Sequence, residues 1–222
     1  MTTISPPAGE SMICSPQQAI RLLQEGNERF AAGKPKRPHA DAARRGEIAR
    51  EGQHPFAVLL TCFDSRVPAE ILFDAGIGDM FVARVAGNIV DTNQLASIEF
   101  AAEHMEVPLA VVLGHTQCAA IAAAVNNTRL HGSLPQLINR IKPAVEMARL
   151  EHFGTSGGDL LSRAIEANVR RSVAELLRGS DVLRRRTERG DLQIVGAIYN
   201  VETGRVEWLP AGTEGDSPRL PR

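Results

Sequence analysis

The sequence predicts an α/β fold with a mostly parallel β-sheet core flanked by helices. Four short apolar runs, bounded by Gly, Pro or Asp, occupy residues 56–61, 80–85, 109–113 and 192–199. They lack clean polar–apolar alternation, which suits strands buried on both faces. Helical stretches occupy residues 92–105, 117–125, 135–150 and 160–177. Strands that alternate with helices predict a parallel sheet with helices packed on both faces.

The two ends of this pattern carry further elements. Apolar residues recur near helical spacing over residues 17–32, after Ser15-Pro16 and before Gly33, so we expect an N-terminal helical arm. A Pro- and Lys-rich connector follows over residues 34–39. Near the C-terminus, a tight turn at 202–205 leads into a last strand over residues 206–209, which should pair antiparallel at the sheet edge.

The chain reads as one domain. Its 222 residues, 43% of them apolar, are enough to bury a sizeable core. We expect a single domain over residues 13–210, a flexible tail at 1–12, and a disordered tail at 211–222 that is rich in Gly, Pro, Ser and charge.

The charge pattern argues against several partners. The net charge is -1, and acidic and basic residues are mixed along the chain, so no nucleic acid is expected. The densest basic run, residues 184–186, is flanked by acidic residues and is typical of the solvated end of a helix. Residues 1–10 do not resemble a secretory signal, and no run approaches the ~20 apolar residues of a membrane span. We therefore expect a cytoplasmic protein with no membrane partner.

Three cysteines make a poor disulfide framework and favour metal ligands or nucleophiles. Cys14 stands alone, without a His or Cys at ligand spacing. Cys62, Asp64 and Arg66 come directly after the first predicted strand, where ligands bind in open α/β sheets. If the extended geometry continues, their side chains project to the same side.

A second group follows the third predicted strand and opens a helix, in the segment Gly-His-Thr-Gln-Cys. Its His115 and Cys118, together with Cys62, form a donor set that suits Zn²⁺ and leaves a fourth position open, as in catalytic sites. The alternative is that the cysteines are small buried apolar residues and His115 is hydrogen-bonded in the core. Spacing alone leaves both interpretations open.

The two motifs together carry a family resemblance. Cys-x-Asp-Ser-Arg, followed about fifty residues later by Gly-His-x-x-Cys, resembles the double signature of the beta-class carbonic anhydrases. The resemblance continues through residues 81–88, 96–100 and 196–204, and covers roughly residues 15 to 209. It implies the zinc-dependent, reversible hydration of carbon dioxide to bicarbonate and a proton.

The resemblance also assigns roles to residues. It implies one zinc ion per chain, held by Cys62, His115 and Cys118. Asp64 and Arg66 match the family's catalytic dyad.

Further matches concern the substrate and the assembly. Gln53 matches a glutamine that hydrogen-bonds bicarbonate, and Phe81 and Phe100 match an aromatic pair of a narrow apolar pocket. The chain departs from the common pattern at Phe100, Val85 and Ala119-Ala120, which affects the finer shape of the pocket. Family members associate with themselves, and Gln53 is expected near a subunit boundary, so we predict a dimer or tetramer.

Two alternative functions remain at this stage. Some relatives with this signature hydrolyse carbonyl sulfide or carbon disulfide, and the shape of the pocket decides between these substrates. A further alternative is a structural or regulatory module that zinc stabilises and that has no catalytic activity. A structural zinc, however, normally has all four positions filled by protein.

One branch of the family has a closed state, in which the aspartate leaves its arginine for the metal. There, bicarbonate favours closure from a pocket of Trp, Arg and Tyr. The matching positions here are Leu59, Arg84 and Tyr199, so the Trp is absent. We therefore expect an open resting state in which Asp64 is bonded to Arg66.

Overall fold

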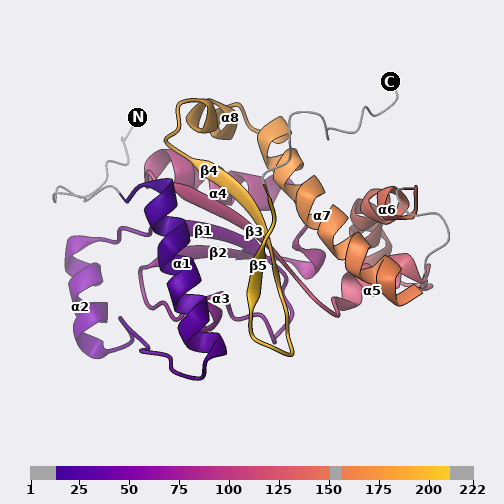
Figure 1. The fold of residues 1–222 in the computed structure, drawn as a ribbon. Coiled ribbons are helices and arrows are strands. Elements are labelled where there is room, and N and C mark those ends of the chain that lie inside the picture. Colours follow the sequence, from indigo (N-terminus) through magenta and orange to yellow (C-terminus); the bar gives the residue numbers. More distant parts are fainter. Residues whose placement is uncertain (1–13, 151–156, 211–222) are drawn as a thin grey trace.

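A five-stranded sheet forms the centre of the computed structural model, which describes residues 14–150 and 157–210. Its strand order is β2-β1-β3-β4-β5. The strands are β1 (Ala57–Thr61), β2 (Met80–Arg84), β3 (Leu109–His115), β4 (Gln193–Tyr199) and β5 (Val206–Trp208). The first four pair in parallel and β5 pairs antiparallel with β4. The predicted mostly parallel sheet with an antiparallel edge strand is confirmed (Figure 1).

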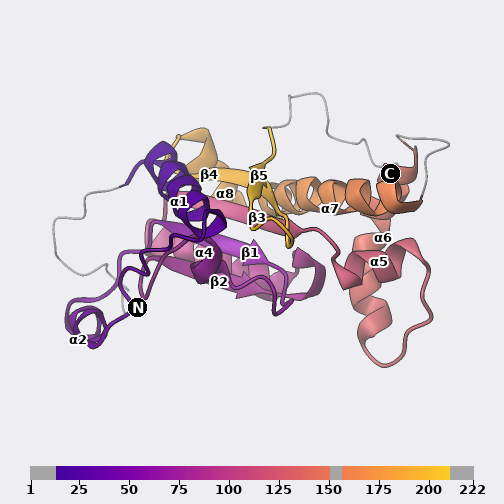
Figure 2. The same cartoon turned by 60° about the horizontal axis from the view of Figure 1, so that its bottom comes forward.

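Helices surround this sheet (Figures 1 and 2). They are α1 (Pro16–Ala31), α2 (Ala42–Glu51), α3 (Ala69–Leu72), α4 (Thr92–His104), α5 (Ala119–Val125), α6 (Leu134–Leu150), α7 (Gly157–Gly179) and α8 (Asp181–Glu188). Sequence patterns had not predicted α2 or α3. The basic run at 184–186 lies within α8, a helix of its own. The tails expected at residues 1–12 and 211–222 lie outside the described residues.

Alternate side chains of the central strands enter two separate cores. Leu59 and Val111 pack on the face covered by α1 and α3. Leu60 and Val112 pack on the opposite face, with residues of α4, α7 and α8. Period-two alternation explains this division. Both faces of β1 and β3 are therefore apolar, which accounts for their unbroken hydrophobic runs.

Helix α1 packs against the sheet of its own chain. A capping box between Ser15 and Gln18 starts the helix, and Leu23 is fully buried. The Asn27 amide donates to the carbonyls of Leu72 and Gly204, and its oxygen accepts from the N–H of Val206. The predicted N-terminal helix is therefore present, and part of its apolar face packs against its own chain, while Leu22 remains exposed.

Helix α2 stands apart from the sheet (Figures 1 and 2). It begins at the Asp41 cap and has no buried residue. Its sequence has no apolar stripe, which is why periodicity did not predict it. Among residues 14–150 and 157–210, no helix combines the length and apolarity needed to cross a bilayer.

The closest approach of α1 to the body of the protein generates a stability prediction. A Cβ added at Gly26 would lie 1.8 Å from the carbonyl oxygen of Phe73, so Gly26→Ala should destabilise the fold by about 1–3 kcal/mol. Gly46 of exposed α2 meets only the flexible end of Arg50, at 3.0 Å. Gly46→Ala is thus the matched control and should be neutral or stabilising by roughly 0.5–1 kcal/mol. Urea denaturation measures both, and wild-type stability in Gly26→Ala would contradict the packing described.

Candidate metal centre

Two neighbouring strands bring the predicted ligands together. Thr61 of β1 lies opposite Leu113 of β3, so Cys62 emerges beside the end of β3 that carries His115. Cys118 follows as the residue that precedes α5. The ligand atoms of these three residues all lie within 4.8 Å of one another, and all three residues are buried.

The imidazole of His115 is prepared to bind a metal. Its Nδ1 lies 2.9 Å from the carbonyl oxygen of Thr116, to which it can only donate, so the proton is on Nδ1. Nε2 then carries a lone pair, yet this buried atom has no hydrogen-bond partner. Buried polar atoms are normally paired, and a carbonyl on the other ring nitrogen is the usual arrangement for a metal-bound histidine.

The two thiols influence each other strongly. The pKa of Cys62 is lowered to about 4, chiefly by a hydrogen bond from Cys118 and, against the cost of burial, by the backbone N–H groups of Asp64 and Gly87. The same hydrogen bond raises the pKa of Cys118, because its proton is the one donated to Cys62, and burial and repulsion from the first thiolate raise it further. A cation among the three side chains is what would hold both sulfurs as thiolates.

This donor set fits zinc. Two thiolates and one imidazole are typical Zn²⁺ ligands, and three protein ligands leave a fourth position open. A carboxylate oxygen of Asp64 lies 4.0 Å from Nε2 of His115. The fourth position therefore lies beside an acidic side chain.

Asp64 is held by Arg66 through two parallel hydrogen bonds. Nε of Arg66 donates to Oδ1 at 3.0 Å, Nη2 donates to Oδ2 at 2.8 Å, and the Arg66 backbone N–H donates to Oδ1 at 2.9 Å. These bonds lower the pKa of Asp64 to about 2. This pKa lies below the ~3.9 of an aspartate in an unfolded chain. The contribution of ionised Asp64 to folding stability is therefore complete above pH ~3.9 and is lost as the pH falls through about 2. Asp64 is thus ionised at any pH near neutrality.

Arg84 fixes the backbone of the ligand loop. Its Nε donates to the carbonyl of Cys62 at 3.2 Å, and its Nη2 donates to the carbonyl of Asp64 at 2.6 Å. Leu59 and Tyr199 are buried in the core on one face of the sheet.

Comparison with known proteins places this chain in a family. The family model described as "Carbonic anhydrase" matches residues 57–206. Carbonic anhydrase 2 of Mycobacterium tuberculosis is 42% identical over 198 residues, which cover 86% of this chain and 91% of that protein. The chain belongs to the beta-carbonic anhydrase family. Its activity is therefore the zinc-dependent, reversible hydration of carbon dioxide.

Solved beta-carbonic anhydrases have a similar fold. The enzyme CafA of Aspergillus fumigatus matches with a TM-score of 0.70 and 30% identity, over 84% of this chain and 88% of that chain. One of two enzymes from Sordaria macrospora described as tetrameric matches with a TM-score of 0.69 and 26% identity, over 87% of this chain and 98% of that chain. The match over most of each chain extends the likeness from the motifs to the architecture.

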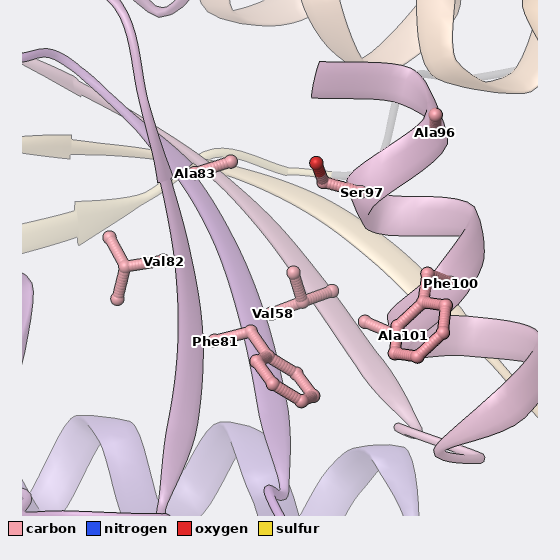
Figure 3. A pocket seen from close by; sticks show the side chains of 8 residues that line it. All are labelled: Val58, Phe81, Val82, Ala83, Ala96, Ser97, Phe100 and Ala101. Atoms are coloured by element: carbon pink, nitrogen blue, oxygen red, sulfur yellow. The ribbon is translucent and has the colours of Figure 1, made fainter. Parts of the chain in front are cut away.

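Three residues assigned to substrate binding lie away from the metal ligands. Gln53 is exposed in the loop before β1, whereas Cys62 follows β1, so the two lie at opposite ends of that strand. Phe81 and Phe100 line an open apolar groove of about 420 Å³ between β2 and α4 (Figure 3). Phe81 lies opposite Val58, and Cys62 is four positions beyond Val58 along the chain, a distance of ~13 Å.

The structure adds residues that the sequence did not single out. The N–H of Gly87 donates to Sγ of Cys62 at 3.3 Å, and Gln117 and Glu202 continue the hydrogen bonds of Arg66 away from the metal site. Gln117 stands between two predicted ligands, which is a local signal. Glu202 is 85 residues away from Gln117 in sequence and has no such signal.

Metal content tests the ligand set. Cys118→Ser should lose the single zinc ion that we expect per chain, because a hydroxyl is a much poorer zinc ligand than a thiolate. Cys14→Ser is the matched control, since Cys14 lies outside the cluster and its thiol donates to the carbonyl of Ser15. Elemental analysis of the purified proteins measures both. Full zinc content in Cys118→Ser would refute the ligand assignment.

Proposed function

We propose that the chain hydrates carbon dioxide at a zinc ion held by Cys62, His115 and Cys118, with Asp64 and Arg66 as the catalytic dyad. The observation that carries this proposal is the unpartnered Nε2 of His115, which lies beside two thiols and 4.0 Å from the Asp64 carboxylate. A metal ligand set and an ionised base at the same place suit the attack of water on a small electrophile.

Zinc, when bound, lowers the pKa of a coordinated water toward ~7. Asp64 accepts a hydrogen bond from the attacking oxygen. This bond points a lone pair of the attacking oxygen at the carbon of carbon dioxide. A new carbon–oxygen bond then forms, and one proton leaves to solvent as bicarbonate is produced. Arg66 holds the carboxylate in place through its paired hydrogen bonds. We take this Asp64–Arg66 pairing as the resting arrangement of the enzyme.

We further propose that a second copy of the chain completes the substrate pocket. Gln53 in the loop before β1, Phe81 on β2 and Phe100 on α4 are too far along the sheet to reach the metal of their own chain. The partner would place its Gln53 amide where charge develops on the bicarbonate oxygens. Support comes from the exposure of Phe100 (42%) and of Phe63 (67%), which adjoins a metal ligand, and from the tetrameric Sordaria relatives.

The assembly proposed is a dimer or tetramer in the cytoplasm. The three cysteines are free thiols, which supports a reducing compartment. Stopped-flow hydration of carbon dioxide, with carbonyl sulfide hydrolysis assayed in parallel, is the direct test of the reaction. Turnover of carbonyl sulfide without hydration of carbon dioxide would overturn the proposal.

The dyad makes a kinetic prediction. Arg66→Ala should lower kcat by roughly 100-fold, because the carboxylate of Asp64 loses the partner that fixes its orientation. Arg189→Ala is the matched control: Arg189 forms a 2.8 Å ion pair with Asp191, also two residues away, at the far end of α8. Zinc content should stay unchanged in both variants. Wild-type kcat in Arg66→Ala would remove the dyad from the mechanism.

Subunit complementation tests the shared pocket. Gln53→Ala and Cys118→Ser chains should each have little activity, but a mixed dimer carries one site with its own zinc and the partner's intact glutamine. Coexpressed chains, purified through two different tags, should therefore recover about half of the wild-type activity. A mixture of Cys62→Ser with Cys118→Ser is the control, because all metal ligands come from one chain. Activity no higher in the first mixture than in the control would contradict the shared pocket.

A further inference from the structure

The dyad depends on an arginine that is exposed to solvent. The side chain of Arg66 is 45% exposed, whereas that of Asp64 is 16% exposed. Exposed ion pairs are worth little, because two flexible side chains must be held in one geometry against competing water. The parallel hydrogen bonds between Arg66 and Asp64 therefore need support from elsewhere in the protein.

Gln117 contacts the opposite side of the guanidinium. Its side-chain oxygen Oε1 accepts from Nη1 of Arg66 at 3.3 Å, and its backbone carbonyl accepts from Nη2 at 3.2 Å. The Asp64 carboxylate occupies the remaining Nε and Nη2 directions. The guanidinium thus lies between a carboxylate and an amide, and its plane is fixed from both sides.

Glu202 determines which way the Gln117 amide faces. Nε2 of Gln117 donates to Oε1 of Glu202 at 3.1 Å, and an ionised carboxylate can only accept. The amide nitrogen must therefore face Glu202, which leaves the amide oxygen toward Arg66. The turn that carries Glu202 is itself held by the side chain of Asn200, which accepts from the N–H groups of Glu202 and Thr203 at 2.9 and 3.1 Å.

The backbone at Gln117 is strained in a way that directs this side chain. Its φ of 58° lies in the left-handed region, which is unfavourable for a residue with a Cβ. Asparagine tolerates that region better but is one methylene shorter. Such strain persists at functional sites when the surrounding structure enforces it. Here, Thr116 anchors the segment, since its N–H donates to the carbonyl of Tyr199 and its hydroxyl accepts from the N–H of Val201.

We propose that Gln117 is a positioning residue for carbon dioxide hydration: together with Glu202 it holds the Arg66 guanidinium in the orientation that fixes Asp64. The inference rests on the proposed function, which gives the dyad its role. Gln117 acts through Arg66 and touches no reacting atom. The relay Asp64–Arg66–Gln117–Glu202 joins the metal edge of the sheet to the turn between β4 and β5.

Gln117→Gly removes the side chain that contacts Arg66 without adding backbone strain, because glycine adopts a positive φ freely. We expect kcat to fall by roughly 10- to 100-fold, with KM nearly unchanged and one zinc ion retained per chain. Asn127→Gly is the matched control, since Asn127 is an exposed amide residue with a φ of 49° at the end of α5. It should keep wild-type kinetics.

A second readout does not depend on activity or zinc. Phenylglyoxal modifies accessible guanidinium groups, and peptide mass spectrometry reports the rate at Arg66 alone. Loss of the Gln117 side chain should raise that rate several-fold, in zinc-free as well as zinc-loaded protein, while Asn127→Gly should leave it unchanged.

A paired substitution separates positioning from general stability. Gln117→Glu alone places a carboxylate against Glu202 and should lower kcat. The double variant Q117E/E202Q introduces a donor at position 202, which re-forms the hydrogen bond to residue 117 in the reverse direction and keeps an acceptor toward Arg66, so kcat should return to within about threefold of wild type. Failure of this rescue, or an unchanged phenylglyoxal rate at Arg66 in Gln117→Gly, would overturn the inference. Full activity in Arg66→Ala would instead overturn the proposed role of the dyad, and the modification rate would still decide whether Gln117 holds Arg66.

Discussion

The parallel pairing of β1 with β3 is the constraint on which the site depends. Both strands are buried on both faces, so each alternate residue has a fixed side of the sheet and a slip by one residue would turn every side chain over. The register that opposes Thr61 to Leu113 places Cys62 beside His115. Backbone geometry set by two apolar cores thus brings together ligands that lie far apart in sequence.

Once assembled, these ligands are electrostatically incomplete without a cation. The two thiols share one favourable negative charge, and the histidine nitrogen beside them has no partner. Hydrogen bonds to backbone carbonyls fix the segments around this centre. Arg84 donates to the carbonyls of Cys62 and Asp64, and the imidazole of His115 donates to the carbonyl of Thr116. The metal ligands are therefore positioned mainly by the sheet, whereas the exposed dyad is positioned by hydrogen bonds of side chains.

The sequence predicted those features of the fold and the site that neighbouring residues encode. The strands and the ligand motifs were predictable because apolar runs and the residues that directly follow them are neighbours in sequence. Helix α2 was not, since it buries nothing and has no apolar stripe. The contact of Gln117 with Glu202 joins residues 85 positions apart, through a turn with no compositional mark. Gln53 was identified by resemblance, and its place at the opposite end of β1 from Cys62 agrees with the strand predicted over residues 56–61.

The most direct test of the central claim is a crystal structure at mildly alkaline pH, with anomalous scattering recorded at the zinc edge. The account predicts one anomalous peak per chain, about 2.3 Å from Sγ of Cys62 and Cys118 and about 2.0–2.1 Å from Nε2 of His115. The Asp64 carboxylate should remain on Arg66. A peak that lacks either sulfur ligand, or a carboxylate of Asp64 bound directly to the metal, would contradict the site as described.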